Sequence, residues 1–336
     1  MNIGHRRYRR ATVATAAVAA GLLLAACSSS SSSSTSAASG GSTAGGGSSA
    51  NLPKTLVFSP LALAIPAMKQ LSQGVQGYAG SKGWKIQVQD PNNDANQQAT
   101  ELNTVVDSGV AGALWIIAVQ PSSMSQTLKA AQSKGIPVLT NGVPSDYGFS
   151  GLQPGITFDV IDYKKYGTIL GQQLAACINK KLGGNAQVLF SRSQVGTAGK
   201  ADIENSAMAA LAAGAPKAKI VSNLVENARA TAQTDIGNAL QGHPGINAVM
   251  STTDEGALGA LGAYSAAGKT LPCVTDAGGN DEVLADVKSG KIYASAHLNF
   301  QGDMTQSFDT LVAMQANPKQ VGKQLYVPIQ VITAGQ

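Results

Sequence analysis

The feature that most constrains this fold is an alternation of strand-like and helix-like segments that begins at Lys54. Short apolar or alternating runs predict strands, and segments with apolar residues at helical spacing lie between them. Strands are expected at 55–59, 85–89, 113–119, 136–140, 187–191, 219–223, 248–251 and 273–275. This alternation predicts an α/β fold with parallel sheets, right-handed crossovers and helices on both faces of each sheet.

Local signals mark where several of the helices begin. Pro66 and Pro121 stand at the first turn of helical segments, where the missing N–H is not needed. Asp94 can cap another helix, with Gln97 three positions later as in a capping box. Roughly 280 residues follow the N-terminal region, which exceeds what one core usually supports, so two lobes are expected. Ligands of such folds bind at the carboxyl ends of the strands.

The N-terminal segment has the pattern of an export signal. Arginines at positions 6, 7, 9 and 10 precede an apolar stretch from Ala11 to Leu24, too short to span a bilayer comfortably. Leu24-Ala25-Ala26-Cys27 then resembles the bacterial lipobox, which predicts a signal peptide over 1–26 and a lipid on Cys27. An ordinary secretory signal is the alternative. The paired arginines also admit twin-arginine export beside the general secretory route.

A Ser- and Gly-rich tether is expected over 27–53, because this composition cannot bury a core. As a flexible coil it would hold the domain on the order of 25 Å from the membrane. The chain has 24 Lys+Arg and 19 Asp+Glu, and four of the arginines belong to the leader, which leaves 20 against 19. A nearly neutral mature chain has no basic footprint for nucleic acid, so that partner is excluded.

Two further cysteines, Cys177 and Cys273, belong to a part of the chain that should meet an oxidising environment. A disulfide between them and two buried free thiols are both compatible with the sequence.

Several motifs, taken in order, resemble the type I periplasmic solute-binding family, whose members bind ribose, galactose and related sugars. Residues 253–260 read TDEGALGA and are similar to the family's NDxxALGA segment. Residues 274–276 read VTD and are similar to a family strand that ends in an aspartate, with AAGK at 266–269 between the two motifs. Residues 134–138, KGIPV, match the segment before the last strand of the first lobe.

The resemblance implies two Rossmann-like lobes joined by three hinge strands, with a ligand enclosed when the lobes close. The crossovers are expected near 157–159, 297–299 and 326–328. Lobe 1 would then comprise 54–157 and 299–326, and lobe 2 would comprise 158–298 and 327–336. The protein is expected to be a monomer.

In the second lobe, Asp276 matches the family carboxylate that accepts hydrogen bonds from ligand hydroxyls, with a helix-capping role as the alternative. Thr253 stands at a ligand-binding position of the family, whereas Asp254 is expected to cap the following helix. Asn299 lies near a hinge position of the family site and is an expected ligand contact. His297, beside it, is expected to be a half-buried imidazole without a ligand role.

In the first lobe, Gln120 and Asn141 end two strands, and their amides can both donate and accept hydrogen bonds. Gln120 matches the family's Asn before Pro, and Asn141 lies one residue before the usual carboxylate position. Turn formation is the alternative for both. Ser59, at the end of the first strand, is also an expected ligand contact.

Departures from the family pattern leave the solute unnamed. Gly142-Val143 replaces the Asp-Arg pair of sugar binders, and Ala67-Met68 replaces an aromatic pair. The second-lobe arginine is missing after Gly196-Thr197, where Ala201 and Ile203 stand; Arg192, which lies nearby, is included among the expected ligand contacts. These changes remove groups that grip a sugar ring.

Two other motifs are weaker. Residues 90–101 carry acidic and amide side chains at calcium-loop spacing, but Ala95 replaces the required glycine. Gly278-Gly279-Asn280 lacks the rest of a phosphate-binding loop. No metal and no cofactor are expected.

The sequence therefore predicts a lipid-anchored, solute-binding protein that delivers a small polar, sugar-like solute to an ABC permease in the membrane. A sensor that presents the bound solute to a membrane signalling partner is the alternative. Catalysis is not expected. The mature chain has only two histidines, His243 and His297, and it has no set of nucleophile, base and orienting group.

Overall fold

The computed structural model describes residues 52–226 and 228–335. The leader, Cys27 and almost all of the predicted tether lie outside these residues. Leu52 packs against the core of the first lobe, and the carbonyl of Pro53 accepts a hydrogen bond from Gln315 Nε2 at 3.1 Å. The last two residues assigned to the tether therefore belong to the folded lobe. Within the described ranges, no helix is both long and apolar enough to cross a membrane.

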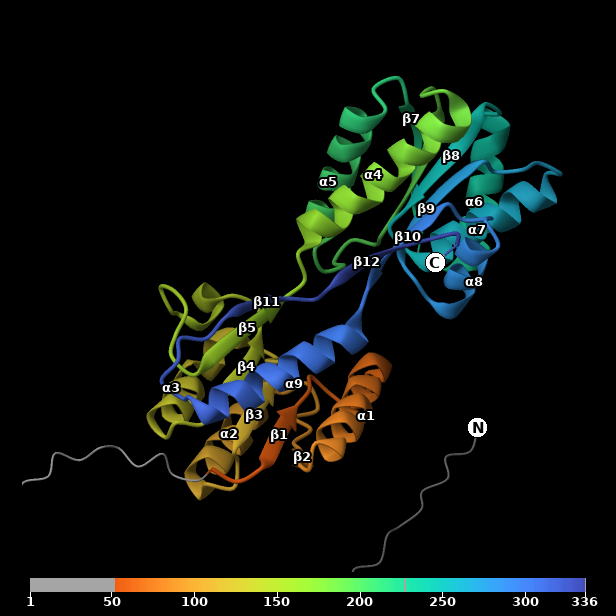
Figure 1. The fold of residues 1–336 in the computed structure, drawn as a ribbon. Coiled ribbons are helices and arrows are strands. Elements are labelled where there is room, and N and C mark those ends of the chain that lie inside the picture. The colour runs from red at the N-terminus through yellow and green to blue at the C-terminus, as the bar shows by residue number, and fades with distance from the viewer. Residues whose placement is uncertain (1–51, 227, 336) are drawn as a thin grey trace, which may run out of the picture. The chain divides into compact units, whose positions relative to one another are not determined.

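The first lobe contains a six-stranded parallel sheet in the order β11-β5-β4-β3-β1-β2 (Figure 1). Its strands are β1 (Thr55–Ser59), β2 (Lys85–Val88), β3 (Ala113–Ile116), β4 (Val138–Asn141), β5 (Ile156–Val160) and β11 (Gln324–Tyr326). Helices α1 (Pro66–Ser81) and α9 (Phe300–Ala316) cover one face, and α2 (Ala95–Ser108) and α3 (Ser125–Ser133) cover the other. Short 3-10 turns follow β3 (Pro121–Met124) and β4 (Pro144–Tyr147).

The second lobe has a sheet in the order β12-β10-β9-β8-β6-β7, parallel except for the antiparallel pair of β10 and β12. Its strands are β6 (Gln187–Arg192), β7 (Lys219–Val225), β8 (Ile246–Ser251), β9 (Cys273–Gly278), β10 (Ala294–Leu298) and β12 (Ile329–Thr333). Helices α4 (Tyr163–Leu182) and α5 (Lys200–Gly214) pack on one face. Helices α6 (Arg229–Gly242), α7 (Asp254–Ala266) and α8 (Asp281–Lys288) pack on the other.

The predicted alternation of strands and helices is confirmed, because each predicted strand overlaps an observed one. Pro66 opens α1, and the Asp94 carboxylate accepts the N–H groups of Asn96 and Gln97, as a capping residue does. A capping box also requires the Gln97 side chain to bond back to the Asp94 N–H. This part of the prediction is wrong, because Gln97 Nε2 donates to Glu101 Oε1 at 2.8 Å. Pro121 opens a 3-10 turn that leads into α3.

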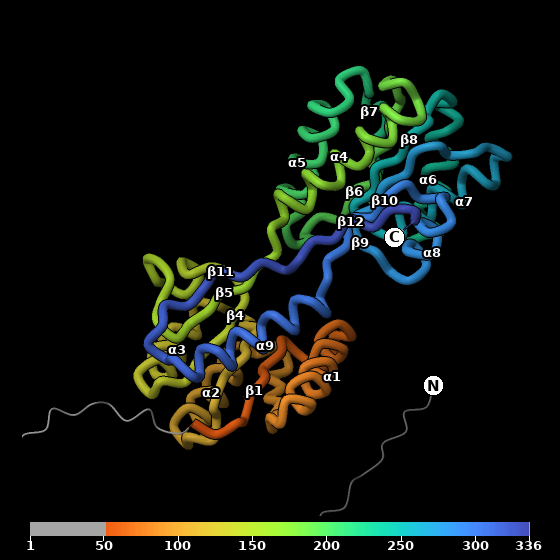
Figure 2. Tube along the Cα trace, viewed as in Figure 1, coloured from red at the N-terminus to blue at the C-terminus, as the bar shows by residue number. Residues whose placement is uncertain are grey.

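The chain passes between the lobes three times, as can be followed in Figure 2: after β5, after β10 and after β11. Backbone hydrogen bonds join these crossovers. The Val327 N–H donates to the Val160 carbonyl at 3.0 Å, and the Asn299 N–H donates to the Pro328 carbonyl at 2.8 Å. The second crossover follows Leu298 of β10, and the third follows Tyr326 of β11.

The first crossover lies later than the predicted boundary after residue 157. Phe158, Asp159 and Val160 remain in β5, where they pair with β11, and Phe158 and Asp159 also pair with β4. The strand continues because its buried face still has partners: Phe158 is fully buried in the first-lobe core. Lobe 1 therefore extends through Val160.

Cys177 of α4 and Cys273 of β9 form a disulfide bond in this structure, with their Cα atoms 5.7 Å apart. Both side chains are fully buried in the core between α4 and the second sheet. Closing a loop across a sequence separation of 96 residues restricts the unfolded chain strongly.

Replacing both cysteines with alanine is expected to lower the free energy of unfolding by about 2–5 kcal/mol, because the unfolded chain regains the entropy that the bond removes. Urea denaturation followed by circular dichroism measures the change. Wild-type protein denatured with and without a reductant is the matched control. Equal midpoints for oxidised wild type and the double variant would contradict a stabilising disulfide.

Candidate functional site

Both sheets bring polar side chains to the edge where their parallel strands end. In the first lobe this edge carries Ser59, Asn141 and Asp159, and in the second it carries Arg192, Glu226, Thr253 and Asp276. Since the carboxyl ends of parallel strands lie on one side of a sheet, residues distant in sequence gather there. This edge is the candidate site in each lobe.

Ser59 ends β1 and is fully buried. Its Oγ accepts a hydrogen bond from Gln98 Nε2 at 3.0 Å. The same amide donates to the Ile117 carbonyl at 3.0 Å, and Gln98 Oε1 accepts the Val119 N–H at 2.9 Å. Gln98 on α2 therefore ties the end of β1 to the segment after β3. Ser59 supports this edge. No acceptor for its hydroxyl proton is found among the described residues, so this proton can still be donated.

Asn141 ends β4, and its Oδ1 accepts the Ala118 N–H at 2.8 Å and the Tyr147 hydroxyl at 3.2 Å. These bonds fix the carboxamide across the ends of β3 and β4. No hydrogen bond from its Nδ2 is found within the described residues, so this group is available as a donor. Gln120 is exposed, and its Nε2 donates to Ser122 Oγ at 3.2 Å. This short-range contact is of the kind found in turns.

Asp276 lies in β9 and is fully buried. The Ser295 hydroxyl donates to its Oδ2 at 2.9 Å, while Oδ1 receives no hydrogen bond from any donor that the structure describes. Burial raises the pKa of Asp276 well above its ordinary value, and the neighbouring Asp254 carboxylate adds to this shift. The group therefore keeps its proton at pH values where an exposed aspartate has lost it. The helix-cap alternative is wrong, because Asn280 caps α8 by accepting the Val283 N–H.

Thr253 takes the capping role that the sequence suggests for Asp254. Thr253 is the capping residue of α7, since its Oγ1 accepts the Gly256 N–H at 3.1 Å. Asp254, in the first helical turn, accepts the N–H groups of Gly279 and Asn280 on its Oδ1 at 2.7 and 3.1 Å. The expectation that Asp254 caps the helix is thus wrong. Gly256 allows the turn to approach closely, because a Cβ there would overlap Ser191 Oγ and Ser251 Oγ.

Arg192 ends β6 and is held by Glu204 of α5. Its Nε donates to Glu204 Oε2 at 2.9 Å, and a terminal nitrogen contacts the same oxygen. Lys200 contacts the other oxygen of Glu204 and donates to the Ser193 carbonyl at 2.6 Å. Glu204 is only 2% exposed, so pairing with two cations offsets the cost of burying its charge. Arg192 is committed to this cluster and lines a hollow of about 490 Å³ beside it.

Asn299 and His297 serve the second crossover. The Asn299 side chain caps α9 by accepting the Gly302 N–H at 2.8 Å. His297 is half-buried, and its Nδ1 lies 3.1 Å from the Gly278 carbonyl oxygen. Both residues hold backbone near the hinge, and His297 has the half-buried position that the sequence predicts.

The sequence did not single out Glu226, which follows β7 and is 1% exposed. Neither of its carboxylate oxygens receives a hydrogen bond from the part of the chain that the structure describes, and burial raises its pKa. Ser193 and Thr252, also missed, form a buried hydroxyl pair with an Oγ to Oγ1 distance of 2.8 Å. Single acidic and hydroxyl residues at strand ends carry no motif, and only the sheet register brings these together.

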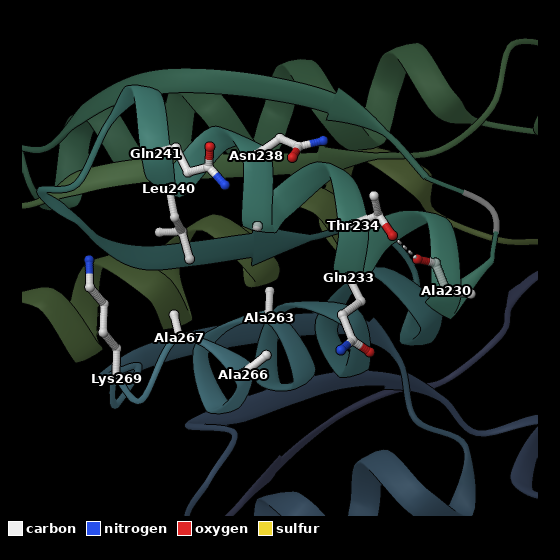
Figure 3. Close-up of a pocket in the computed structure, with 11 residues that line it drawn as sticks. Ala230, Gln233, Thr234, Asn238, Leu240, Gln241, Ala263, Ala266, Ala267 and Lys269 are labelled. Carbon is white, nitrogen blue, oxygen red and sulfur yellow. Dashed lines mark hydrogen bonds between the residues drawn. The ribbon is translucent and has the colours of Figure 1, made fainter.

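A larger hollow, of about 630 Å³, lies away from the strand ends, between α6 and α7 (Figure 3). Its lining is mainly alanine, glycine and uncharged polar residues: Ala230, Gln233, Thr234, Gly237, Asn238, Leu240, Gln241, Ala263, Ala266, Ala267 and Lys269. Figure 3 shows Thr234 bonded to the backbone of Ala230, which is a contact within one helix. This groove has no buried carboxylate or arginine, whereas the strand ends have both.

The calcium-like spacing at 90–101 has another use in the fold. Asp90 Oδ1 accepts the N–H groups of Leu63 and Asn92, at 3.2 and 3.0 Å, and Asp94 caps α2. Glu101 accepts from Gln97. In the described ranges, no cluster of three or more His, Cys, Asp or Glu side chains has a geometry that could hold a metal ion.

Comparison with known proteins gives a consistent result. A family model described as a periplasmic binding protein domain matches residues 56–319. The ribose import binding protein of Bacillus subtilis is 29% identical over 241 residues, which cover 72% of this chain and 75% of that protein. The xylitol-binding protein of Mycolicibacterium smegmatis is 26% identical over 231 residues, which cover 68% of this chain and 62% of that protein.

Among solved structures, the periplasmic ribose ABC transporter protein of Conexibacter woesei superposes with a TM-score of 0.66 and 20% identity. The match covers 86% of this chain and 94% of that one. The similarity confirms the expected architecture of two α/β lobes with mostly parallel sheets.

We expect Asp276→Asn to flatten the dependence of stability on pH. A raised pKa in the folded state means that Asp276 contributes its stability fully below the unfolded pKa of about 3.9, and loses it as pH rises through the folded pKa. The asparagine has no carboxyl proton to lose. The free energy of unfolding of the variant, compared with that of wild type, should therefore increase as pH rises from about 4 to 8. Urea denaturation across this range measures the difference.

Asp202→Asn is the matched control, because it makes the same change at a side chain that is 53% exposed. Its stability difference from wild type should stay within about 0.5 kcal/mol across the pH range. Parallel pH curves for wild type and Asp276→Asn would show that Asp276 does not retain its proton.

Proposed function

This chain belongs to the periplasmic binding protein family, and we propose that it is a lipid-anchored receptor that captures a small, sugar-like solute for an ABC importer. Membership in the family implies an extracytoplasmic location, and it confirms the expectation of a solute-binding protein rather than an enzyme. Three features support the finer proposal: the polar strand ends, the binding roles of the relatives and the lipobox-like leader.

The observation that carries the solute class is a set of buried carboxyl oxygens without hydrogen-bond partners at the strand ends of the second lobe. Among the described residues, no partner is found for either carboxyl oxygen of Glu226 or for Oδ1 of Asp276. Burial raises the pKa of both groups, which favours the protonated form, in which one oxygen donates and the other accepts. Buried polar groups without partners are costly, so they favour a ligand whose own groups both donate and accept hydrogen bonds. The cations nearby do not fill this need, because Arg192 and Lys200 are bound to Glu204. A polyhydroxylated solute would satisfy these carboxyl groups.

The first lobe would contribute a donor to the same solute. Asn141 is fixed by the bonds to its Oδ1, which leaves its Nδ2 directed by the fold rather than free to rotate. A fixed donor loses little entropy on binding. Closure of the three-strand hinge would then enclose the solute, and the closed form would dock on the permease.

Sugar binding is tested by native mass spectrometry of protein purified gently from its own host, followed by calorimetry with the compound found and with a panel of pentoses, hexoses and polyols. Asn141→Asp is expected to weaken binding by about tenfold or more, because the change turns the free donor into an acceptor while keeping Oδ1 for Ala118.

Asn238→Asp is the matched control, since it makes the same change in the groove between α6 and α7. Its affinity should stay within about twofold of wild type. Loss of binding in Asn238→Asp but not in Asn141→Asp would move the site to that groove. Failure of every sugar and polyol to bind would remove the proposed solute class.

Membrane anchoring is tested at Cys27. In a bacterium that processes lipoproteins, Cys27→Ser is expected to move the protein from the membrane fraction to the soluble extracytoplasmic fraction, because the acyl chains supply the attachment. Immunoblots of fractionated cells measure the distribution, and Ser28→Ala is the control. Membrane retention of Cys27→Ser would favour the ordinary secretory signal followed by another mode of attachment.

A further inference from the structure

The lobe-1 ends of all three crossovers meet at one cluster of side chains. Asp159 is the residue before the last one of β5, where the chain first leaves the lobe. Asp303 lies in the first turn of α9, where the chain returns. Tyr326 ends β11, where the chain leaves again. A change in this cluster can therefore affect every segment that links the lobes.

Asp159 and Asp303 are neighbouring carboxyl groups, and each shifts the pKa of the other. Asp303 is only 8% exposed, and Oδ1 of Asp159 is buried without a donor among the described residues. Two neighbouring carboxyl groups cannot both carry a charge without strong repulsion. The stable arrangement therefore has one proton shared between them.

Gln306 connects the pair to the third crossover. Its Nε2 donates to Asp303 Oδ1 at 2.8 Å and to the Tyr326 carbonyl at 2.9 Å. The cluster thus runs from β5 through α9 to β11 by side-chain contacts. It lies wholly within the first lobe, on the side from which the hinge segments extend.

The other groups around the pair are neutral or already engaged. Asn141 of β4 pairs in register with Asp159, and the Gly142 N–H donates to the Asp159 carbonyl at 2.7 Å. Asp162, which follows β5, caps α4 by accepting the Lys165 N–H. On β11, Gln324 donates to carbonyls of Gly142 and Leu325. No lysine, arginine or histidine in the described ranges is among the groups that act on either carboxyl.

Burial raises the pKa of Asp159 to about 8, and the charge of Asp303 and its hydrogen bond to Asp159 add to the shift. Burial also raises the pKa of Asp303, while hydrogen bonds from Gln306 and Asp159 oppose that rise. The two carboxyl groups titrate together in two steps. The step at the higher pH is the loss of the proton that they share.

We infer that Asp159 and Asp303 share a proton that clamps the three crossovers at the first lobe, so that the hinge is firm at neutral pH and loosens in alkaline conditions. Loss of the proton leaves two negative charges, one half-buried on β5 and one buried on α9, with no cation among the described residues to offset them. Repulsion then separates the two segments, and Gln306 transmits the change to the end of β11.

Hydrogen exchange measured by mass spectrometry tests this directly in solute-free protein. After correction for the intrinsic effect of pH, exchange in residues 158–163 and 299–306 should rise by about tenfold between pH 7 and pH 9. With a pKa of about 8, the deprotonated fraction rises from about one tenth to about nine tenths over this interval. Asp303→Asn should abolish this rise, because an amide can donate to Asp159 without a titrating proton.

Asp309→Asn is the matched control on the same helix; its carboxylate bonds to the exposed Tyr78 hydroxyl at 3.2 Å, and the pH step should persist in this variant. Asp159→Asn provides a second test if Asp303→Asn folds poorly, and it should also abolish the step. A step that persists in either hinge variant, or no step in wild type, would overturn the inference. Because the readout needs no solute, it is independent of the proposed function.

Discussion

Parallel pairing of the strands is the constraint on which the rest of this structure depends. Each βα unit adds a strand in the same direction, so every strand of the first sheet, and all but β12 of the second, ends at one edge. Ser59 and Asn141 are far apart in sequence, yet they end strands separated only by β3. Apolar burial fixes this register, since Leu114, Val138 and Phe158 fill the core directly behind the edge. The site is thus a consequence of packing behind it.

Buried carboxyl groups give the strand ends their chemical character. Glu204 is compensated by two cations, and the other buried acids are not: within the described chain, no lysine, arginine or histidine pairs with Asp276, Glu226 or the Asp159–Asp303 pair. Desolvation raises the pKa of each of them, which means that protons partly take the place of cations. A surface of buried carboxyl groups whose neighbouring arginine, Arg192, is bound to Glu204 differs from one built around a bidentate arginine. It is better suited to a neutral solute whose hydroxyl groups donate and accept hydrogen bonds.

The sequence predicted the parts of the fold that depend on local patterns. The apolar run at 113–119 and the capping aspartate Asp94 fixed β3 and the start of α2 well, because burial and capping are encoded within a few residues. The first crossover could not be placed in this way. Whether residues 158–160 continue β5 depends on β11, which pairs with them from more than 160 residues later in the chain. Long-range pairing of this kind leaves no local signal.

Site residues follow the same division. The place of Asp276 near a strand end could be expected from the family motif in which it stands, and its contact with a ligand stays a prediction. Glu226 and Asp303 are single acids on ordinary segments and gain their importance only from burial. Thr253 and Asp254 show a subtler limit: both are good capping residues, and the choice between them depends on Gly279 and Asn280, whose N–H groups require an acceptor across the β9 turn. With Asp254 committed there, Thr253 caps α7. The need to satisfy backbone donors at one strand end thus decides which side chain caps the helix at the next, and this coupling ties the candidate site to the stability of the lobe.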